Sequence, residues 1–366
     1  MGSSCDILEF EAFKDGGGVR VSVVIPVYDG AHTLGFCLEA LKRSARLPDE
    51  CIVVDDGSSD CSAEIAANYG ATVVSTGGRC GPARARNMGA RQATGDVLLF
   101  IDADVTVHAD VVERVVSRFE LEPELDGLIG TYDNAPADPG FVSQFKNLMH
   151  AFVHCQGKPD AWTFWCGCGA VRRSVFVEHG GLDESYTRPA IEDIEFGYRL
   201  RFAGHAIALD PGIQCKHLKT WTFWSLVYTD VFHRGLPWTK LILRTGMLPD
   251  DLNLRWSQRV SAILAALLLP ICVLAAWQMS GTPALLPQST LLAAASAIIG
   301  AILAANWKFY AFLAGQRGWF SAICALPLHI LYFIYSLASF GLGLASHLLG
   351  LAAYAPKRAP VADVKE

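Results

Sequence analysis

Charged residues almost vanish near the end of this 366-residue chain, and that change restricts its possible folds more than any motif does. Between residues 260 and 355 the only charged side chains are Lys308 and Arg317, whereas residues 1–259 hold 34 of the 36 acidic and 25 of the 30 basic residues. Long apolar segments suit a lipid bilayer, while the charged part has the composition of a water-soluble domain. The sequence therefore predicts a soluble domain joined to a membrane region.

The apolar region divides into about three membrane-spanning segments. Its runs cover 260–279, 284–305 and 319–354. Each of the first two has about the 20 residues that a spanning helix needs. The third is too long for one span, and Pro327 and Gly341-Leu342-Gly343 are its candidate breaks.

Basic residues set the expected orientation. Four of them precede the first apolar run, and two more lie between the second and third runs, within the loop expected at 306–318. The positive-inside rule then places the soluble domain and this loop in the cytoplasm, in a multi-pass protein of the inner (plasma) membrane. Residues 1–18 lack the apolar core of a secretory signal, which agrees with that orientation. Lys357 and Arg358 would fall outside after three spans, so either the last segment re-enters or the rule fails there.

Composition excludes several classes of protein. A hydrophobic content of 52% excludes a disordered chain. The soluble part is acidic, which argues against a nucleic-acid partner held by a basic surface. Eleven cysteines without regular spacing argue against a disulfide-stapled secreted domain and indicate reduced thiols. Cys166 and Cys168 have no second pair at zinc spacing, so we interpret them as free thiols.

Strands and helices alternate from residue 20 onward. Continuous β-branched and apolar runs are typical of parallel strands buried on both faces of a sheet. Pro26 is expected to end the first of them. The strands are predicted at 21–25, 51–54, 72–74 and 97–101, and the helices at about 33–46, 61–69 and 82–93. This pattern predicts an α/β sheet whose ligands bind beyond the carboxyl ends of the strands.

Carboxylates follow two of these strands. Asp102 and Asp104 come directly after the fourth strand, where they suit Mg²⁺ or Mn²⁺ bridging the protein to a nucleotide diphosphate. Asp55 and Asp56 follow the second strand and can accept hydrogen bonds from a base imide or a ribose hydroxyl. A single such pair is usually a solvated turn. Two pairs at the ends of strands in one sheet favour a ligand site.

A third segment opens a helix that can attract phosphate. Pro82 provides a favourable helix start, and Arg84 and Arg86 follow it at a spacing of two residues. Arginines at helix starts are common, so this segment gains meaning only beside the two aspartate pairs.

Together these segments resemble the family 2 inverting glycosyltransferases of the GT-A fold. The resemblance covers about residues 20–220. Its motifs are S-V-V-I-P-V-Y-D-G at 22–30, I-V-V-D-D-G-S-S-D at 52–60, A-R-N-M-G at 85–89, D-A-D at 102–104, G-G-L-D-E at 180–184 and E-D-I-E-F-G-Y-R-L at 192–200. It implies a GT-A type nucleotide-diphospho-sugar transferase domain, with a Rossmann-like mixed sheet, followed by an all-α transmembrane region.

The resemblance also implies which residues bind the donor. Asp102 and Asp104 would hold the metal, and Asp56, with Asp55, would read the base. Gly169 belongs to a small-residue segment that lies against the donor sugar in relatives. The nucleotide-sugar-binding residues implied are Pro26, Tyr28, Asp55, Asp56, Arg86, Asp102, Gly169 and His217. A hydrogen-bonded structural histidine is the alternative for the last of these.

On the acceptor side the resemblance assigns the catalytic pair Glu192 and Asp193. Asp193 would be the general base that deprotonates the acceptor hydroxyl as it attacks the anomeric carbon, so no covalent enzyme intermediate is needed. The alternative is a carboxylate that only caps a helix start. The Q-x-x-R-W pattern of processive relatives is missing after His233, which argues against polymer synthesis and secretion.

The expected function is a membrane-anchored, metal-dependent inverting glycosyltransferase of cell-envelope glycan biosynthesis. It would move a sugar from a nucleotide sugar, with a UDP-sugar favoured, to the hydroxyl of a lipid-linked or membrane-proximal acceptor. The expected partners are thus the nucleotide-sugar donor, a lipid-linked or glycan acceptor, and the membrane. The alternatives are a polyprenyl-phosphate glycosyltransferase, a nucleotidyltransferase, and a non-catalytic membrane scaffold with a degenerate transferase domain. Against the nucleotidyltransferase, this chain lacks the Gly-rich, lysine-containing loop that such enzymes carry after the first strand. The expected divisions are an N-terminal extension (1–19), a catalytic domain (20–230), a juxtamembrane segment (231–259), transmembrane helices (260–354) and a tail (355–366).

Overall fold

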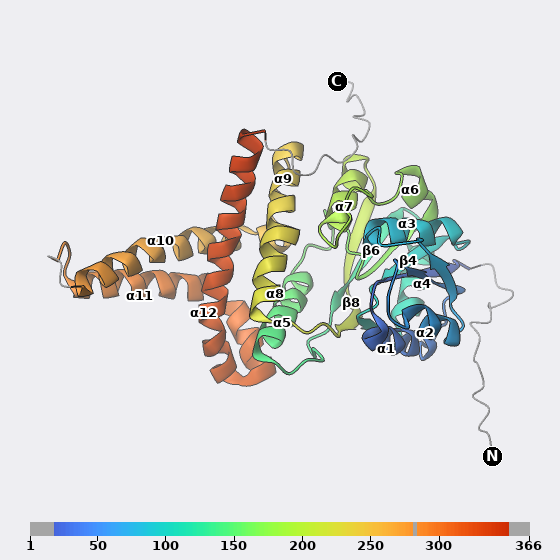
Figure 1. Cartoon of the computed structure of the whole chain (residues 1–366), viewed down its shortest axis with the longest axis horizontal. Helices are drawn as coiled ribbons and strands as arrows, with labels where there is room; N and C mark the ends of the chain where they lie inside the picture. Colours follow the sequence, from blue (N-terminus) through green and yellow to red (C-terminus); the bar gives the residue numbers. More distant parts are fainter. Residues whose placement is uncertain (1–17, 281–283, 351–366) are drawn as a thin grey trace, which may run out of the picture. The chain divides into compact units, whose positions relative to one another are not determined.

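The computed structural model describes residues 18–280 and 284–350, which form two compact units that divide after Thr220 (Figure 1). The first unit contains a β-sheet with its covering helices, and the second is helical. Nearly all of the expected N-terminal extension and the whole expected tail, with Lys357 and Arg358, lie outside the described residues.

A mixed eight-stranded sheet forms the centre of residues 18–220, in the order β3-β2-β1-β4-β7-β6-β8-β5. The first four strands are mutually parallel, β7 is antiparallel to both β4 and β6, and β5 is antiparallel to β8. The strands are β1 (Val21–Val27), β2 (Glu50–Asp55), β3 (Thr72–Ser75), β4 (Val97–Ile101), β5 (Val105–Val107), β6 (Leu125–Tyr132), β7 (Cys168–Arg172) and β8 (Ala206–His217). The predicted Rossmann-like mixed sheet is confirmed.

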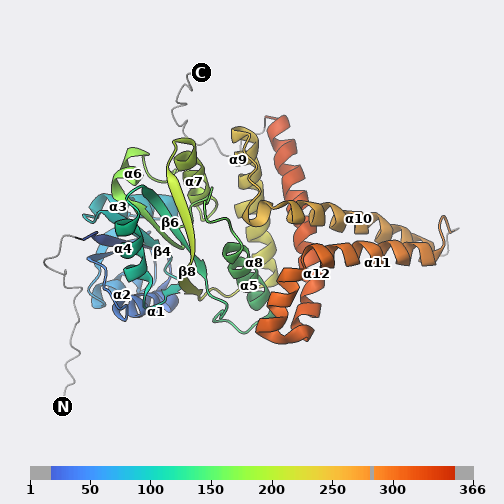
Figure 2. The same cartoon turned by 180° about the vertical axis from the view of Figure 1, so that it is seen from behind.

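Helices cover both faces of this sheet (Figures 1 and 2). They are α1 (Ala31–Lys42), α2 (Ser62–Asn68), α3 (Pro82–Gln92), α4 (Val111–Leu121), α5 (Phe141–Cys155), α6 (Arg173–Glu178) and α7 (Glu192–Phe202). Side chains of α1 and α4 pack in one apolar core, and side chains of α3, α6 and α7 pack in the other. Along β1, Val23 and Ile25 enter the first core while Val24 enters the second, as alternate residues of a strand must. That is why β1 and β4 are apolar at nearly every position.

Pro26 does not end β1, contrary to the sequence expectation. The strand continues to Val27, and Pro26 pairs with Val54 of β2. On its other side β1 pairs with β4 only as far as Val24. Beyond that point one edge of β1 is unpaired, so a residue without a backbone N–H is accommodated.

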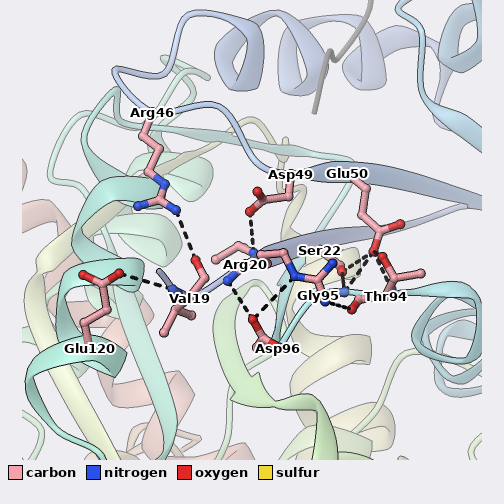
Figure 3. A network of polar contacts seen from close by, with 11 residues as sticks. Val19, Arg20, Ser22, Arg46, Asp49, Glu50, Thr94, Gly95, Asp96 and Glu120 are labelled. Atoms are coloured by element: carbon pink, nitrogen blue, oxygen red, sulfur yellow. Dashed lines mark hydrogen bonds and ion pairs between the residues drawn. The ribbon is translucent and has the colours of Figure 1, made fainter. Parts of the chain in front are cut away.

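Hydrogen bonds tie together the amino ends of β1, β2 and β4, at the edge opposite the predicted site (Figure 3). The Glu50 carboxylate accepts from the Ser22 hydroxyl and from the backbone N–H groups of Thr94, at 2.5 Å, and Gly95, at 3.2 Å. Burial opposes ionisation of Glu50, but these bonds outweigh it and hold its pKa below the usual range. Asp49 accepts from the Val21 N–H at 2.7 Å. Polar residues therefore fix the amino edge of the sheet.

The second unit contains three helices long and apolar enough to cross a membrane, counted over its described residues. These are α10 (Trp256–Met279), α11 (Gln288–Ala305) and α12 (Trp307–Leu348). The shorter elements before them are α8 (Phe223–Tyr228), a π-helical segment (Thr229–Gly235), α9 (Leu236–Thr245) and a 3₁₀ turn (Leu252–Leu254). Asn306 donates to the Ser261 hydroxyl at 2.8 Å and accepts from Gln258 at 3.0 Å, which joins the start of α12 to α10.

Helix α12 differs from the expected third span. It begins at Trp307, so most of the expected 306–318 loop is helical, and it runs through Pro327 and Gly341-Leu342-Gly343, where breaks were expected. Its break lies instead at Gly318, whose φ of 81° requires the left-handed backbone that glycine adopts most easily. Proline is tolerated in spanning helices because neighbouring groups satisfy the freed carbonyl.

Candidate active site

The carboxyl ends of β1, β2 and β4 meet at one edge of the sheet because these strands are parallel. Tyr28 follows β1, Asp56 follows β2, and Asp102 and Asp104 follow β4. The structure therefore brings the predicted strand-end residues together, as the topology requires.

Arg86 joins the strand-end carboxylates to helix α7. Its guanidinium donates to Asp102 Oδ1 at 2.6 Å and to Glu192 Oε1 at 3.0 Å. The side chains of Arg86 and Glu192 are each only 6% exposed, so this is a buried, charge-assisted pair. Burial raises the pKa of Asp102, and Arg86 opposes that rise. Arg86 thus links Asp102, at the predicted donor site, to Glu192 of the predicted catalytic pair.

Asp193 lies beside this pair at the start of α7. Its Oδ2 accepts from the backbone N–H of Cys166 at 3.2 Å, and its Oδ1 accepts from the N–H of Ile194 at 2.8 Å. Burial and the neighbouring Glu192 charge raise the pKa of Asp193 to about 7, and Arg86 limits the rise. A carboxylate with that pKa is suited to accept a proton near neutral pH.

His217 lies next to Asp104 because β8 pairs with β5. Val105 is opposite His217 in that pairing, and His217 Nε2 lies 3.5 Å from Asp104 Oδ2. Burial raises the pKa of Asp104, but its interactions with His217 outweigh this and lower the pKa to about 2. The other ring nitrogen, Nδ1, hydrogen-bonds Asn147 Oδ1 of α5 at 2.8 Å. The Tyr132 ring stacks on the imidazole, with 4.4 Å between ring centroids.

The carboxylate of Asp56, predicted to read a base, anchors a loop. It accepts from the backbone N–H groups of Cys80 and Gly81, each at 2.8 Å, and from the Thr76 hydroxyl at 3.1 Å. Asp55 accepts from the Ser58 N–H at 3.0 Å. Asp56 therefore holds the loop at residues 76–81 in place, and its predicted contact with a base stays a prediction.

Tyr28 presents an exposed ring at the same end of the site. The guanidinium of Arg79 lies over this ring, 4.0 Å from its centroid. Arg79 belongs to the loop that Asp56 anchors. A planar cation stacked on an aromatic ring forms a surface suited to the face of a base and to a nearby phosphate.

Gly169, predicted to lie against the donor sugar, is buried in β7. A Cβ atom added there would come within 2.1 Å of the Trp165 carbonyl oxygen, so the backbone packs closely at this position. Its predicted contact with the sugar stays a prediction. Arg172, at the end of β7, donates to the carbonyls of Leu125, at 2.8 Å, and Pro123, at 2.9 Å.

Sequence reasoning missed Asn147, Tyr132 and Arg79. The first lies in the 130–165 region, in which no motif was found, and it meets His217 only because α5 packs beside β8. Arg79 follows Gly77-Gly78, and this pair of glycines before a basic residue was the one signal available.

The side chains that the structure describes do not complete a binding site for a divalent cation, so a bound nucleotide would have to supply further oxygen atoms. No cluster of three or more His, Cys, Asp or Glu side chains able to hold a cation occurs among residues 18–280 and 284–350. However, the side chains of Asp102 and Asp104 are 31% and 32% exposed, so neither is fully buried. Asp102, Asp104 and His217 do not form a complete cation site by themselves, so Mg²⁺ or Mn²⁺ bound there would need phosphate oxygens and water to complete its shell.

Comparisons with known proteins find glycosyltransferases. Residues 22–180 match the family model described as Glycosyl transferase family 2. The chain is 31% identical over 125 residues to glycosyltransferase GlyG of Streptococcus pneumoniae serotype 4. The aligned residues are 33% of this chain and 41% of the relative. It is 27% identical over 240 residues to validoxylamine A glucosyltransferase of Streptomyces hygroscopicus subsp. limoneus, where the alignment covers 55% of this chain and 52% of the relative. The chain thus spans about half the length of these curated relatives.

One solved structure shares the fold over most of the chain. The mannosyltransferase PcManGT from Pyrobaculum calidifontis, in complex with GDP-Man and Mn²⁺, aligns with 84% of this chain and 87% of its own. The TM-score is 0.56 at 21% sequence identity. This likeness confirms the GT-A type fold of the sheet and its helices.

Proposed function

We propose that this chain, which carries a family 2 glycosyl transferase domain at residues 22–180, transfers a sugar from a nucleotide-sugar donor to an acceptor hydroxyl with inversion at the anomeric carbon. The observation that supports this most is the bridge made by Arg86. One guanidinium contacts Asp102, on the predicted donor side, and Glu192, the neighbour of the predicted base. The two halves of an inverting displacement thereby meet in one site.

Asp193 is the proposed general base. Backbone N–H groups of Cys166 and Ile194 hold its carboxylate in place, and its pKa of about 7 suits proton transfer near neutral pH. It takes the proton of the acceptor hydroxyl as that oxygen attacks the anomeric carbon. The bond to the nucleoside diphosphate breaks on the opposite face, so a single displacement inverts the configuration.

The leaving diphosphate needs positive charge around it. Arg86 supplies a cationic group at the strand ends, and Tyr28 with Arg79 forms a surface for the nucleotide. Asp102 and Asp104, with His217, would hold Mg²⁺ or Mn²⁺, whose charge, when bound, stabilises the developing negative charge on the diphosphate.

The proposed acceptor is lipid-linked or lies close to a membrane. Three long apolar helices in the second unit support association with a bilayer. Basic residues before the first of these helices favour a cytoplasmic catalytic domain at the inner (plasma) membrane. A membrane anchor of this kind would hold the active site near lipid head groups, where such an acceptor presents its hydroxyl.

Nucleotide binding by the full chain in detergent tests the donor site. We expect UDP or GDP to bind more tightly with Mn²⁺, and Asp104→Ala to lose that dependence on the metal. Asp96→Asn is the matched control, because Asp96 lies at the opposite edge of the sheet (Figure 3), where an exposed pair with Arg20 contributes little. Failure of the folded wild-type protein to bind either nucleotide would overturn the proposal.

Transfer assays test the base. Asp193→Asn should abolish sugar transfer and leave nucleotide binding at the wild-type level, because the proposed base acts on the acceptor. Transfer by this variant at the wild-type rate would refute the role of Asp193.

A further inference from the structure

We propose that Asn147 is a positioning residue that keeps a proton on His217 Nδ1, so that Nε2 is the ring nitrogen available to a divalent cation beside Asp104. This inference rests on the proposed function, because it concerns the metal side of the same site. It assigns a role to α5, in which the sequence shows no motif.

The orientation of the Asn147 amide follows from two hydrogen bonds. Its Nδ2 donates to the Lys219 carbonyl oxygen at 3.2 Å, and its Oδ1 lies 2.8 Å from His217 Nδ1. An amide nitrogen only donates and an amide oxygen only accepts. The bond to Lys219 therefore directs Oδ1 at the imidazole, and Nδ1 must carry the proton of this bond. This holds for both the neutral and the protonated ring.

Other contacts hold the ring of His217 toward Asp104. The Leu218 N–H donates to the backbone carbonyl of Asp104 at 2.8 Å, next to the pairing of Val105 with His217. Tyr132 stacks on the imidazole with an angle of 14° between the planes, and His217 is 6% exposed. The ring therefore has little freedom to turn over.

The spacing between His217 and Asp104 fits two ligands of one ion. Nε2 and Oδ2 are 3.5 Å apart, which is longer than an ordinary N–H···O bond of about 2.7–3.2 Å. In a neutral ring protonated at Nδ1, Nε2 carries the lone pair. Outer hydrogen-bond partners of ligating histidines fix the tautomer and the ring orientation in this way.

A purely structural role makes a different prediction. If Asn147 only ties α5 to β8, its replacement changes stability and leaves metal affinity unchanged. If it positions His217, replacement weakens metal binding by about 10- to 100-fold, the usual effect of losing such a partner.

The test measures Mn²⁺ affinity by electron paramagnetic resonance on the full chain in detergent, with UDP, with GDP and with neither. We expect Asn147→Leu to bind Mn²⁺ about 10- to 100-fold more weakly and to bind nucleotide without metal as the wild type does. Asn147→Asp should match or exceed wild-type metal affinity, because a carboxylate also accepts from Nδ1. Gln144→Leu, on the same helix, is the control and should leave metal affinity unchanged, because Gln144 donates to the carbonyl of Asp138.

A double mutant separates positioning from general damage. His217→Ala should weaken Mn²⁺ binding, and adding Asn147→Leu should weaken it further by no more than about twofold, because the two side chains act through one contact. Additive losses, or equal losses in Asn147→Asp and Asn147→Leu, would overturn the inference. If Asn147→Leu does not fold, Asn147→Ser, which also lacks an acceptor at this distance, is used in its place.

The two proposals fail in different ways. Wild-type protein that binds Mn²⁺ with nucleotide and transfers sugar, together with an Asn147→Leu variant of unchanged metal affinity, overturns only the role of Asn147. Folded wild-type protein that binds neither Mn²⁺ nor nucleotide overturns the proposed function, and this inference with it.

Discussion

The rate of sugar transfer should fall steeply below neutral pH if Asp193 is the general base. Its pKa of about 7 means that the carboxylate, the form that accepts a proton, predominates only above that pH. As pH falls through 7 the group is protonated and kcat/KM for the acceptor declines. A carboxylate of ordinary pKa would remain ionised throughout this range.

The size of the effect follows from the titration. With a pKa of about 7, about 3% of Asp193 is ionised at pH 5.5, whereas about 98% of an unperturbed aspartate would be. The expected loss of kcat/KM between pH 8.5 and pH 5.5 is therefore about 30-fold.

Glu192→Gln gives an independent check on the cause of the shift. Its charge raises the pKa of Asp193, so the neutral amide should move the midpoint of the pH profile to lower pH. The loss of its carboxylate also leaves the Arg86 charge less neutralised, which acts in the same direction. A matched change at the opposite edge, Asp96→Asn, should leave the midpoint unchanged.

The assay is the initial rate of transfer at subsaturating acceptor, from pH 5.5 to pH 9 at constant ionic strength. Samples returned from pH 5.5 to pH 8.5 must recover their rate, which separates titration from unfolding. A flat profile over this range, or a midpoint unmoved by Glu192→Gln, would refute the argument.

Three further predictions concern the same site. Arg86→Leu leaves Glu192 buried without its cation, so we expect a loss of about 3–5 kcal/mol in the free energy of unfolding, measured by denaturant titration, and no transfer; a stable, active variant would contradict this. Gly197→Ala places a Cβ 2.2 Å from the Phe164 backbone nitrogen, so thermal unfolding should show a cost of about 1–3 kcal/mol, and an unchanged midpoint would count against tight packing of α7. Removing divalent cations with EDTA should abolish transfer, and Mn²⁺ should restore it; full activity in EDTA would exclude a role for Asp102 and Asp104 as metal ligands.

The sequence predicts the carboxyl edge of the sheet well, for a physical reason. Parallel strands buried on both faces are nearly continuous apolar runs, so the polar residues that follow them stand out. The parallel arrangement then brings Asp56 and Asp102 to one edge. The family resemblance added Asp193, whose distance in the sequence from the strands gives no local signal. The roles assigned to these residues stay predictions.

Other features depend on contacts that a local pattern does not contain. Pro26 continues β1 because the neighbouring strand β4 stops pairing at Val24, which is a property of the sheet. Asn147 meets His217 across 70 residues of chain. Helix α12 incorporates Lys308 and Arg317, whose charges suggested a loop, because its break occurs at Gly318.

The buried Arg86 bridge also limits how this domain can be recombined with its relatives. The arginine comes from the first half of the domain and its partner Glu192 from the second, 106 residues later. A chimera joined between them inherits one member of the pair from each parent, so it is expected to fold only when both parents supply matching charges. To change specificity by replacing the second half of the domain, which contains α7, the α3 segment with Arg86 should be replaced as well, so that both members of the pair come from one parent.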